Sequence, residues 1–549
     1  MAHIPLKGGG EPLTYPLGMV MDGWPQSRLR AQRGGIPALS RVAADLAPAT
    51  YAAGVAIAVA IGAALRLQRV LSADFPLHDG GLTYAMVRDL QAASFRMPTF
   101  SSYNGGQVPF AYPPLGIYLA AALDRLTPAG VLDLLRFLPL AFSLLSVGAF
   151  ALLARSLLPG RGAALAATLL FTAYSQGFAW FIMGGGLPRS LGLLFALLTL
   201  LWLHRLCLEG RPLYAGACGV AAGLALLSHV EMAWFMGLSA LLLLLFHGLR
   251  DPWLWRWGAV AAACAALVSA PWWGSVLVRY GPDTLLAPGS SRPLFSIEEL
   301  SRVFTYHLGH SLPFLVVLAL ALLGASASLR EGRPFLLVWL AVGAFAAPWL
   351  FPRLTGLPLH LLGGLGWQRL VRPWAAAFLA VTCALGLALA ALTATDPLPI
   401  DEPLSLKARQ AMAWAADNLP SGSLVVVVEN RSWWDDVAAE WLPSLTPHLS
   451  VVTPQGLEWV PGAFNRRVKA YESLQKCAEQ GVDCLWAWTA ETGLRYQYVW
   501  VSKEPRYDLR QQGYDDCCGP LRRSLSQSLD FETVYDGPGA TIFRRTGLP

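Results

Sequence analysis

Charged residues are scarce in this chain of 549 residues: Asp, Glu, Lys and Arg together make up only 14% of it, and the mean hydropathy is +0.45. So little charge over such a length excludes an ordinary soluble protein. The scarcity is also uneven, because charges are sparse between about Ala47 and Thr395 and common after Asp396. We therefore expect a membrane-embedded block followed by a water-exposed domain of roughly 150 residues.

Several motifs that would indicate a known chemistry are also missing. The sequence contains no Walker A motif, no GxGxxG after a strand, no HExxH and no GxSxG elbow. It also lacks the repeated halves with broken helices that are typical of secondary transporters. The net charge of +6 does not indicate a nucleic-acid partner, since arginines at the ends of spans are expected of a membrane protein.

Apolar segments of the length needed to cross a bilayer, about 20 residues, recur through the block. We expect spans at 48–68, 132–154, 162–182, 188–207, 213–229, 231–248, 257–277, 309–329, 335–351 and 374–395. A weaker candidate, 354–368, is broken by Pro358 and several glycines. The predicted fold is a polytopic α-helical membrane protein with about 10–11 spans and a small C-terminal α/β domain.

Arginine placement predicts the orientation. Four short connections carry paired arginines: Arg155 and Arg161, Arg205 and Arg211, Arg250 and Arg256, Arg330 and Arg333. If these connections are cytoplasmic, the alternate connections face outward. The outward set includes the loop 71–131 (here the Asp79 loop), the glycine turn before residue 189, the corner near residue 230 and the loop 278–308.

The sequence divides into three predicted domains. Residues 1–46 are rich in Gly and Pro and lack the features of a cleaved signal peptide, so we expect a disordered cytoplasmic leader followed by an uncleaved signal anchor. Residues 47–395 form the membrane domain and residues 396–549 the soluble α/β domain. In the last of these we expect a helix over Asn465–Gln480, a strand over Gln497–Ser502 and a closing hairpin in VYDGPGATIFRR.

The eight cysteines fall into two groups. Cys207, Cys218, Cys264 and Cys383 lie in apolar segments, where cysteine is a small hydrophobic residue. Cys477, Cys484, Cys517 and Cys518 lie in the C-terminal domain, where their even number permits disulfides, for instance between one of the first two and one of the later pair. Four free thiols are the alternative. Disulfides favour an external domain, which requires eleven crossings; ten would leave the domain inside.

The Asp79 loop carries the leading candidate for catalysis. Asp79 follows the first span within the sequence HDGG, where neighbouring glycines let a substrate approach the backbone. Such a carboxylate suits a general base or a metal ligand; a solvated loop carboxylate is the alternative. His78 is a candidate for holding that carboxylate, for ligating a metal ion or for binding substrate, and the alternative is that it has no role. Tyr103, Asn104 and Tyr112 further along the loop are candidate substrate-binding residues, because sugar rings stack on aromatic faces, although aromatics also form interfacial belts.

Basic side chains at the outer ends of spans form a second group of candidates. Arg189 follows GGGLP, Arg279 follows PWWGSVLV, and Arg372 precedes the last span. Arginine binds phosphate bidentately, and at Arg189 a helix start with exposed backbone N–H groups would add to the binding of an anion. The alternative is membrane anchoring.

A third group lies at the corner SHVEMAW. His229 and Glu231 are ionisable groups near membrane depth, where such residues are rare and often functional. Glu231 would be a second acid or a metal ligand and His229 its hydrogen-bond partner, with a simple helix cap as the alternative. His307 and His310 are spaced for a shared metal ion, but no third ligand accompanies them.

Taken in order, these features resemble the polytopic GT-C glycosyltransferases, especially the protein O-mannosyltransferases and the lipid A aminoarabinose transferases. The shared features are one span, a large external loop that opens with an acid, a PPL re-entry (AYPPLGIYLAA, Pro113–Pro114–Leu115), about ten more crossings and an external C-terminal domain. The family's loop usually has a paired acidic DE where this chain has HDGG. Asp79 matches the family's acid, and Glu231 is our candidate for the missing partner.

The resemblance implies transfer of a sugar from a polyprenyl-phosphate donor to a lipid, glycan or protein acceptor outside the cytoplasm, at the cell membrane. Asp79 would activate the acceptor in an inverting displacement, and Arg189, Arg279 or Arg372 would stabilise the phosphate charge. Dependence on a divalent metal ion stays open. The alternative function is a non-enzymatic transporter or scaffold for envelope glycan or lipid, whose external domain binds partners.

Overall fold

The computed structural model describes residues 45–290, 296–346, 348, 353–371, 377–395, 401–508 and 513–546. The predicted leader 1–46 lies almost wholly outside the described residues, as does Arg372. Residues Leu46–Pro549 form one compact unit, to which the following account is confined.

The membrane domain is built of long helices, and each predicted span overlaps one of them. They are α2 (Pro48–Leu71), α6 (Val131–Leu157), α7 (Arg161–Ala173), α9 (Gly186–Glu209), α10 (Leu213–Ser228), α11 (Val230–Gly248), α12 (Pro252–Tyr280), α15 (Leu312–Arg330), α16 (Phe335–Ala346), α17 (Gly356–Leu370) and α18 (Phe378–Ala394). By length and composition, six of the described helices can cross a membrane, and α7, α10, α16 and α18 are apolar but shorter. The chain is a polytopic helical membrane protein.

The predicted span 162–182 is shorter in the structure than in the sequence interpretation. Helix α7 ends at Ala173, because Tyr174 adopts an extended backbone, and the short turns α8 (Ser175–Phe178) and η1 (Ala179–Phe181) follow. These turns lead the chain to the glycine turn before α9. Helices α13 (Pro282–Ser290) and α14 (Ile297–His310) lie between α12 and α15 in the chain.

The weak candidate 354–368 is a helix, α17, and the glycines that weakened its prediction form its packing surface. A Cβ at Gly366 would overlap the backbone of Leu320 and Gly324 in α15, and a Cβ at Gly364 would overlap Ala163 in α7. Small residues let membrane helices approach closely. Helix α17 therefore packs backbone to backbone against α15 and α7, and most of it is buried.

The Asp79 loop folds into short elements between α2 and α6. It contains α3 (Gly81–Ala92), a small hairpin of β1 (Phe100–Ser101) and β2 (Val108–Pro109) around α4 (Tyr103–Gly106), and α5 (Leu115–Leu126), which follows the two prolines of the PPL sequence. Helix α5 packs against α3 and α6.

The C-terminal segment forms a five-stranded mixed sheet covered by helices. The strand order is β4-β3-β5-β9-β8, in which β3 (Leu424–Val428), β4 (Leu449–Ser450) and β5 (Tyr498–Ser502) are parallel. Strand β9 (Ala540–Arg545) is antiparallel both to β5 and to its hairpin partner β8 (Phe531–Asp536). The helices are α19 (Leu406–Asn418), α20 (Val437–Leu445), α21 (Ala463–Gln475), α22 (Cys477–Gln480), α23 (Val482–Thr492) and α24 (Gly519–Gln527); η5 (Leu457–Trp459) and the ribbon of β6 (Pro505–Asp508) and β7 (Gly513–Asp516) complete it. The expected helix 465–480 is thus split between α21 and α22.

The disulfides differ from the pairing suggested by the sequence. Cys477 is bonded to Cys484 and Cys517 to Cys518, so the bridges join neighbours and not one early cysteine to one late cysteine. The pairing that we expected was wrong because α22 and the turn at Gly481 bring Cys477 and Cys484 together locally.

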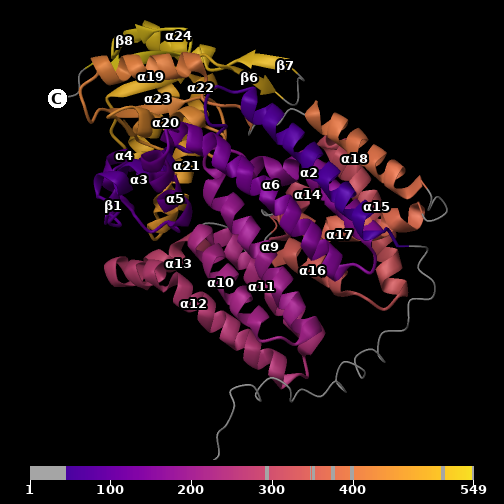
Figure 1. Cartoon of the computed structure of the whole chain (residues 1–549). Helices are drawn as coiled ribbons and strands as arrows, with labels where there is room; N and C mark the ends of the chain where they lie inside the picture. Colours follow the sequence, from indigo (N-terminus) through magenta and orange to yellow (C-terminus); the bar gives the residue numbers. More distant parts are fainter. Residues whose placement is uncertain are drawn as a thin grey trace, which may run out of the picture. The chain divides into compact units, whose positions relative to one another are not determined.

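The Asp79 loop and the C-terminal domain share one hydrophobic core. Buried residues of the loop, among them Phe75, Met86 and Phe110, belong to the same cluster as Trp441 and Ile542 of the C-terminal domain. Figure 1 shows α20 next to α3. Loop and domain therefore lie on the same face of the membrane domain.

Candidate active site

Asp79 lies in a tight turn that ends at the start of α9. His78 has a left-handed backbone (φ 53°) and Gly80 has φ 143°, so the chain reverses around Asp79. The Gly185 N–H donates to Asp79 Oδ1 at 2.9 Å, and Arg189 Nη2 lies 3.5 Å from Asp79 Oδ2. The Asp79 side chain is 23% exposed, so its carboxylate is held by α9 yet reachable.

The glycine turn before α9 is shaped around this carboxylate. A Cβ at Gly185 would lie 2.6 Å from Asp79 Oδ1, and one at Gly184 would overlap the Asp79 carbonyl. The Gly184 N–H donates to Leu77 O, and the Gly185 N–H also contacts Asp79 O. The helix start that the sequence predicted as an anion site thus binds an anion of the chain itself, Asp79.

Two guanidinium groups meet at Trp180. The Arg353 guanidinium lies 4.4 Å from the centre of the Trp180 ring and that of Arg189 lies 5.5 Å from it, both within cation–π range. The His78 ring is 6.0 Å from the same tryptophan. Sequence reasoning missed Arg353 and Trp180; the signal for Arg353 was its position at the edge of the weak span 354–368.

His229, Glu231 and Tyr112 gather around Arg189, as the shared outer face predicted. Arg189 interacts electrostatically with Asp79, Tyr112 and Glu231. The Tyr112 and His229 rings are 6.0 Å apart in an edge-on arrangement. These three residues come from the Asp79 loop and from the corner between α10 and α11, so the structure brings together segments more than a hundred residues apart.

A second carboxylate reaches the Asp79 turn from the C-terminal domain. Glu440 in α20 accepts hydrogen bonds from three consecutive N–H groups: Gly80 (3.3 Å), Gly81 (3.0 Å) and Leu82 (3.0 Å). Burial raises the pKa of Glu440 to about 8, and the nearby Asp79 charge adds to the rise, while the three N–H groups oppose it. Sequence reasoning missed Glu440; its signal was a lone acid in the apolar run VAAEWLP.

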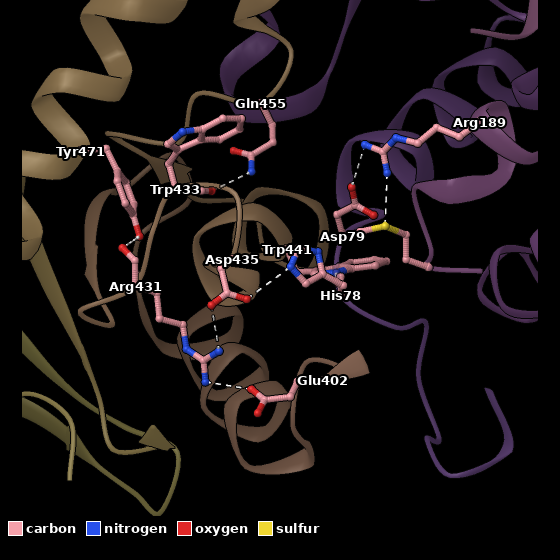
Figure 2. A network of polar contacts seen from close by, with 11 residues as sticks. His78, Asp79, Arg189, Glu402, Arg431, Trp433, Asp435, Trp441, Gln455 and Tyr471 are labelled. Carbon is pink, nitrogen blue, oxygen red and sulfur yellow. Dashed lines mark hydrogen bonds and ion pairs between the residues drawn. The ribbon is translucent and has the colours of Figure 1, made fainter. Parts of the chain in front are cut away.

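His78 lies next to a chain of ionisable side chains that continues into the C-terminal domain (Figure 2). His78 Nε2 lies 3.5 Å from Asp435 Oδ1, Asp435 Oδ2 lies 3.5 Å from Arg431, and Arg431 Nη2 donates to Glu402 at 2.9 Å. Arg431 is half enclosed by three acids, Glu429, Asp435 and Glu402, which raise its pKa above the ordinary value although burial opposes this.

Other predicted site residues are engaged elsewhere. The Tyr103 hydroxyl donates to Glu440 O at 2.8 Å, and Asn104 exchanges two hydrogen bonds with Ser450, so both tie the loop to the C-terminal domain. Arg279 donates to the carbonyls of Met97 and Pro98, and no described contact joins it to Asp79.

The metal candidates do not converge. Within the described part of the chain, no three His, Cys, Asp or Glu side chains are grouped so that they could hold a metal ion. His307 packs against the rings of Tyr306 and Phe314, and the side chain of His310 is not among those described.

Part of the membrane domain is similar in sequence to a known protein family. Residues 111–274 match a family described as dolichyl-phosphate-mannose-protein mannosyltransferase, a match confined to part of the membrane domain. No protein with a curated description matches the sequence.

Solved structures show where the fold occurs. The chain is similar to arabinofuranosyltransferase AftD from Mycobacteria (TM-score 0.56, 17% identity), over 92% of this chain and 40% of that one. It is similar to the oligosaccharyltransferase AglB from Archaeoglobus fulgidus, in complex with an inhibitory peptide and a dolichol-phosphate (TM-score 0.56, 14% identity, 83% and 69% coverage). It is also similar to ArnT from Cupriavidus metallidurans bound to undecaprenyl phosphate (TM-score 0.51, 15% identity, 91% and 98% coverage).

The chain therefore spans about two fifths of the length of AftD but almost the whole of ArnT. At these identities the similarity concerns the fold, and the family match adds a sequence relationship over the membrane helices. By fold, the chain is therefore similar to these glycosyltransferases, and residues 111–274 are similar in sequence to the matched family.

Proposed function

We propose that the chain is a membrane glycosyltransferase that moves a sugar from a polyprenyl-phosphate donor to an acceptor on the outer face of the membrane. The observation that carries this proposal is the partly exposed Asp79 carboxylate paired with Arg189 at the start of a membrane helix. The relatives support the donor class: the matched family is named for a dolichyl-phosphate sugar, and the AglB and ArnT structures contain dolichol-phosphate and undecaprenyl phosphate.

The proposed reaction needs one base. Asp79 takes the proton of an acceptor hydroxyl while the acceptor oxygen bonds to the anomeric carbon of the donor sugar. The bond from that carbon to the phosphate oxygen breaks, and its electron pair leaves with the polyprenyl phosphate. Gly185 holds Asp79 Oδ1, which leaves lone pairs on Oδ2 for the proton. A single displacement of this kind inverts the anomeric centre.

We assign the leaving phosphate to Arg189 and Arg353. Both guanidinium groups lie over Trp180, and two positive charges on one aromatic platform suit the charge that develops on the phosphate. Arg189 Nε is buried and has no hydrogen-bond partner among the described residues, so the group keeps donor capacity. Of the predicted arginines, Arg279 is replaced in this role by Arg353, because its guanidinium is engaged by loop carbonyls.

The acceptor and sugar side is assigned to Tyr112, His229 and Glu231. Each interacts electrostatically with Arg189, and Tyr112 also faces Trp459 of the C-terminal domain across 6.0 Å. Glu231 then helps to orient the acceptor beside Asp79. For Tyr103 and Asn104 we propose a role in docking the C-terminal domain, because their polar atoms are occupied there.

We also propose that the C-terminal domain is extracytoplasmic. The end of α18 lies beside the end of α2, where Arg69 Nη2 donates to Thr393 O at 2.8 Å. Both helices thus exit on the face of the Asp79 loop, which the arginine distribution predicts to be external. The disulfide between Cys477 and Cys484 agrees with an oxidising compartment.

Reconstitution tests the proposal. The purified chain in proteoliposomes is supplied with undecaprenyl phosphate carrying mannose, arabinose or aminoarabinose, together with envelope extract as the acceptor source. We expect turnover with one donor and a loss of about 10²–10⁴-fold in kcat for Asp79→Asn, the usual cost of removing a general base. Arg189→Ala and Arg353→Ala should weaken binding of undecaprenyl phosphate by roughly tenfold or more.

Arg302→Ala is the matched control. Arg302 lies in α14, is exposed, and pairs only with acids of its own helix among the described residues. It should leave turnover and lipid binding unchanged. Binding of undecaprenyl phosphate without turnover in the wild type would instead favour the transporter or scaffold. Full turnover in Asp79→Asn would refute the assigned base.

A further inference from the structure

We infer that Glu440 is a positioning residue for Asp79, and that the C-terminal domain is thereby a part of the active site. The contact of Glu440 with the Asp79 turn is given by the hydrogen bonds themselves and does not depend on the proposed function. Its effect on turnover rests on the proposed function.

The carboxylate of Glu440 sits on the first turn of α3. Three consecutive backbone N–H groups, those of Gly80, Gly81 and Leu82, point at its two oxygens. The N-terminus of a helix leaves such N–H groups without partners inside the helix and carries a partial positive charge. Glu440 supplies the partner from a segment about 360 residues further along the chain, at a site that is 2% exposed.

The neighbours of Glu440 in α20 hold the other side of the turn. Trp441 Nε1 donates to His78 O at 2.9 Å, and Ser444 Oγ donates to Gly81 O at 2.8 Å. A Cβ at Gly80 would lie 2.9 Å from the Trp441 ring, so only glycine lets the indole approach. The residues immediately before and after Asp79 are therefore both held by one helix of the C-terminal domain.

This arrangement fixes the backbone of Asp79 from one side while α9 fixes its side chain from the other. Gly185 and Arg189 contact the carboxylate, and Glu440 and Trp441 contact the flanking backbone. A catalytic carboxylate displaced by 1 Å typically costs two orders of magnitude in rate. A base that lies in a loop needs such support, because loops move more than the helices they connect.

Capping a helix with a buried carboxyl group costs free energy, which argues that Glu440 has a role beyond capping α3. Removing an ionisable group from water is costly, and a hydroxyl would satisfy an N–H group at less cost. The nearby Asp79 charge further disfavours the ionised form of Glu440.

Activity measurements with three variants test the role in turnover. Glu440→Ala should lower kcat by about 10–100-fold with little change in the donor KM, because the base is displaced while the lipid site is kept. Glu440→Gln keeps the shape and one acceptor oxygen, so it should recover most of kcat and alter the pH–rate profile. Asp436→Asn is the matched control, since Asp436 is also buried and caps α20, but turns toward Ala439 and Tyr471.

Hydrogen–deuterium exchange of the same proteins gives a readout that does not depend on turnover. Peptides covering residues 78–90 should exchange faster in Glu440→Ala than in the wild type, and Asp436→Asn should leave them unchanged. Equal exchange in Glu440→Ala and the wild type would overturn the inference even if the chain is an active transferase. A wild type without turnover would reject the proposed function, while the exchange result would still decide whether Glu440 holds the turn.

Discussion

Replacing Gly185 by alanine tests whether the start of α9 is built around the Asp79 carboxylate. A Cβ at this position would lie 2.6 Å from Asp79 Oδ1 and 2.9 Å from Oδ2. Gly185 has φ −77°, which alanine adopts freely, so the substitution acts through this clash and not through backbone strain. The carboxylate must retreat by roughly 1 Å before the contact becomes an ordinary one.

The expected loss follows from that displacement. A misplacement of about 1 Å costs a reacting group on the order of 10²-fold in rate, and forcing an extra methyl group into a packed site costs about 1–3 kcal/mol of stability. We therefore expect kcat in Gly185→Ala to fall about 100-fold in the proteoliposome assay. The KM for the donor should change little, because Arg189 and Arg353 keep their places over Trp180.

Gly148→Ala in α6 is the control for a glycine replaced in a membrane helix. Nothing lies within 4 Å of a Cβ at Gly148, and alanine favours a helix over glycine by up to about 1 kcal/mol. This variant should keep its activity and melt no lower than the wild type. Wild-type kcat in Gly185→Ala would show that the position of the Asp79 carboxylate does not depend on the turn, and would refute the reasoning.

Three further predictions concern stability. Since the pKa of Glu440 rises from 4.5 in the unfolded chain to about 8 in the folded one, the unfolded state loses its proton first. Between about pH 5 and pH 8 the wild type should therefore lose stability on the order of 4 kcal/mol relative to Glu440→Gln, whose side chain does not titrate. A pH-independent difference in Tm between the two proteins would contradict this. Gly366→Ala should cost about 3 kcal/mol, because its Cβ overlaps the backbone of α15, and an unchanged melting curve would argue against that packing. Replacing Cys477 and Cys484 together by serine should cost about 2–3 kcal/mol, the loop-closure entropy of a short bridge, and reducing agent should then have less effect on the variant than on the wild type.

The membrane helices could be predicted because their cause is local. A run of about 20 apolar residues specifies a span wherever it occurs, so each predicted span overlaps a helix. The exceptions are instructive. The last carbonyls of α7 are bonded by other helices, since Arg66 donates to Thr172 O and Thr393 Oγ1 donates to Ala173 O. Helix α17 contains glycines that permit close packing against α15 and α7. Neither partner can be known from the segment itself.

The candidate site likewise has residues that the sequence could group and contacts that it could not predict. Asp79, Arg189, Tyr112, His229 and Glu231 were grouped by one argument, that alternate connections share a face, and the structure brings them together. That argument could not predict which residues of the face lie next to one another. Arg279 lies on the predicted face but points to the carbonyls of Met97 and Pro98, a contact that depends on how the loop folds.

The second acid near Asp79 shows most clearly why part of the site could not be predicted from the sequence. The sequence interpretation expected a partner for Asp79 and sought it among the membrane connections, where Glu231 was the candidate. The structure places Glu231 near Arg189, but it places a different carboxylate, Glu440, on the backbone of the Asp79 turn. In the sequence, Glu440 is a lone acid in an apolar run of a separate domain, and nothing local shows that it contacts the Asp79 turn. Its position follows from the shared core of the loop and the C-terminal domain. Because Phe75, Met86 and Trp441 are buried together in that core, α20 lies against the Asp79 turn. If this core assembles the site, then removing the C-terminal domain should abolish turnover even with every membrane residue intact.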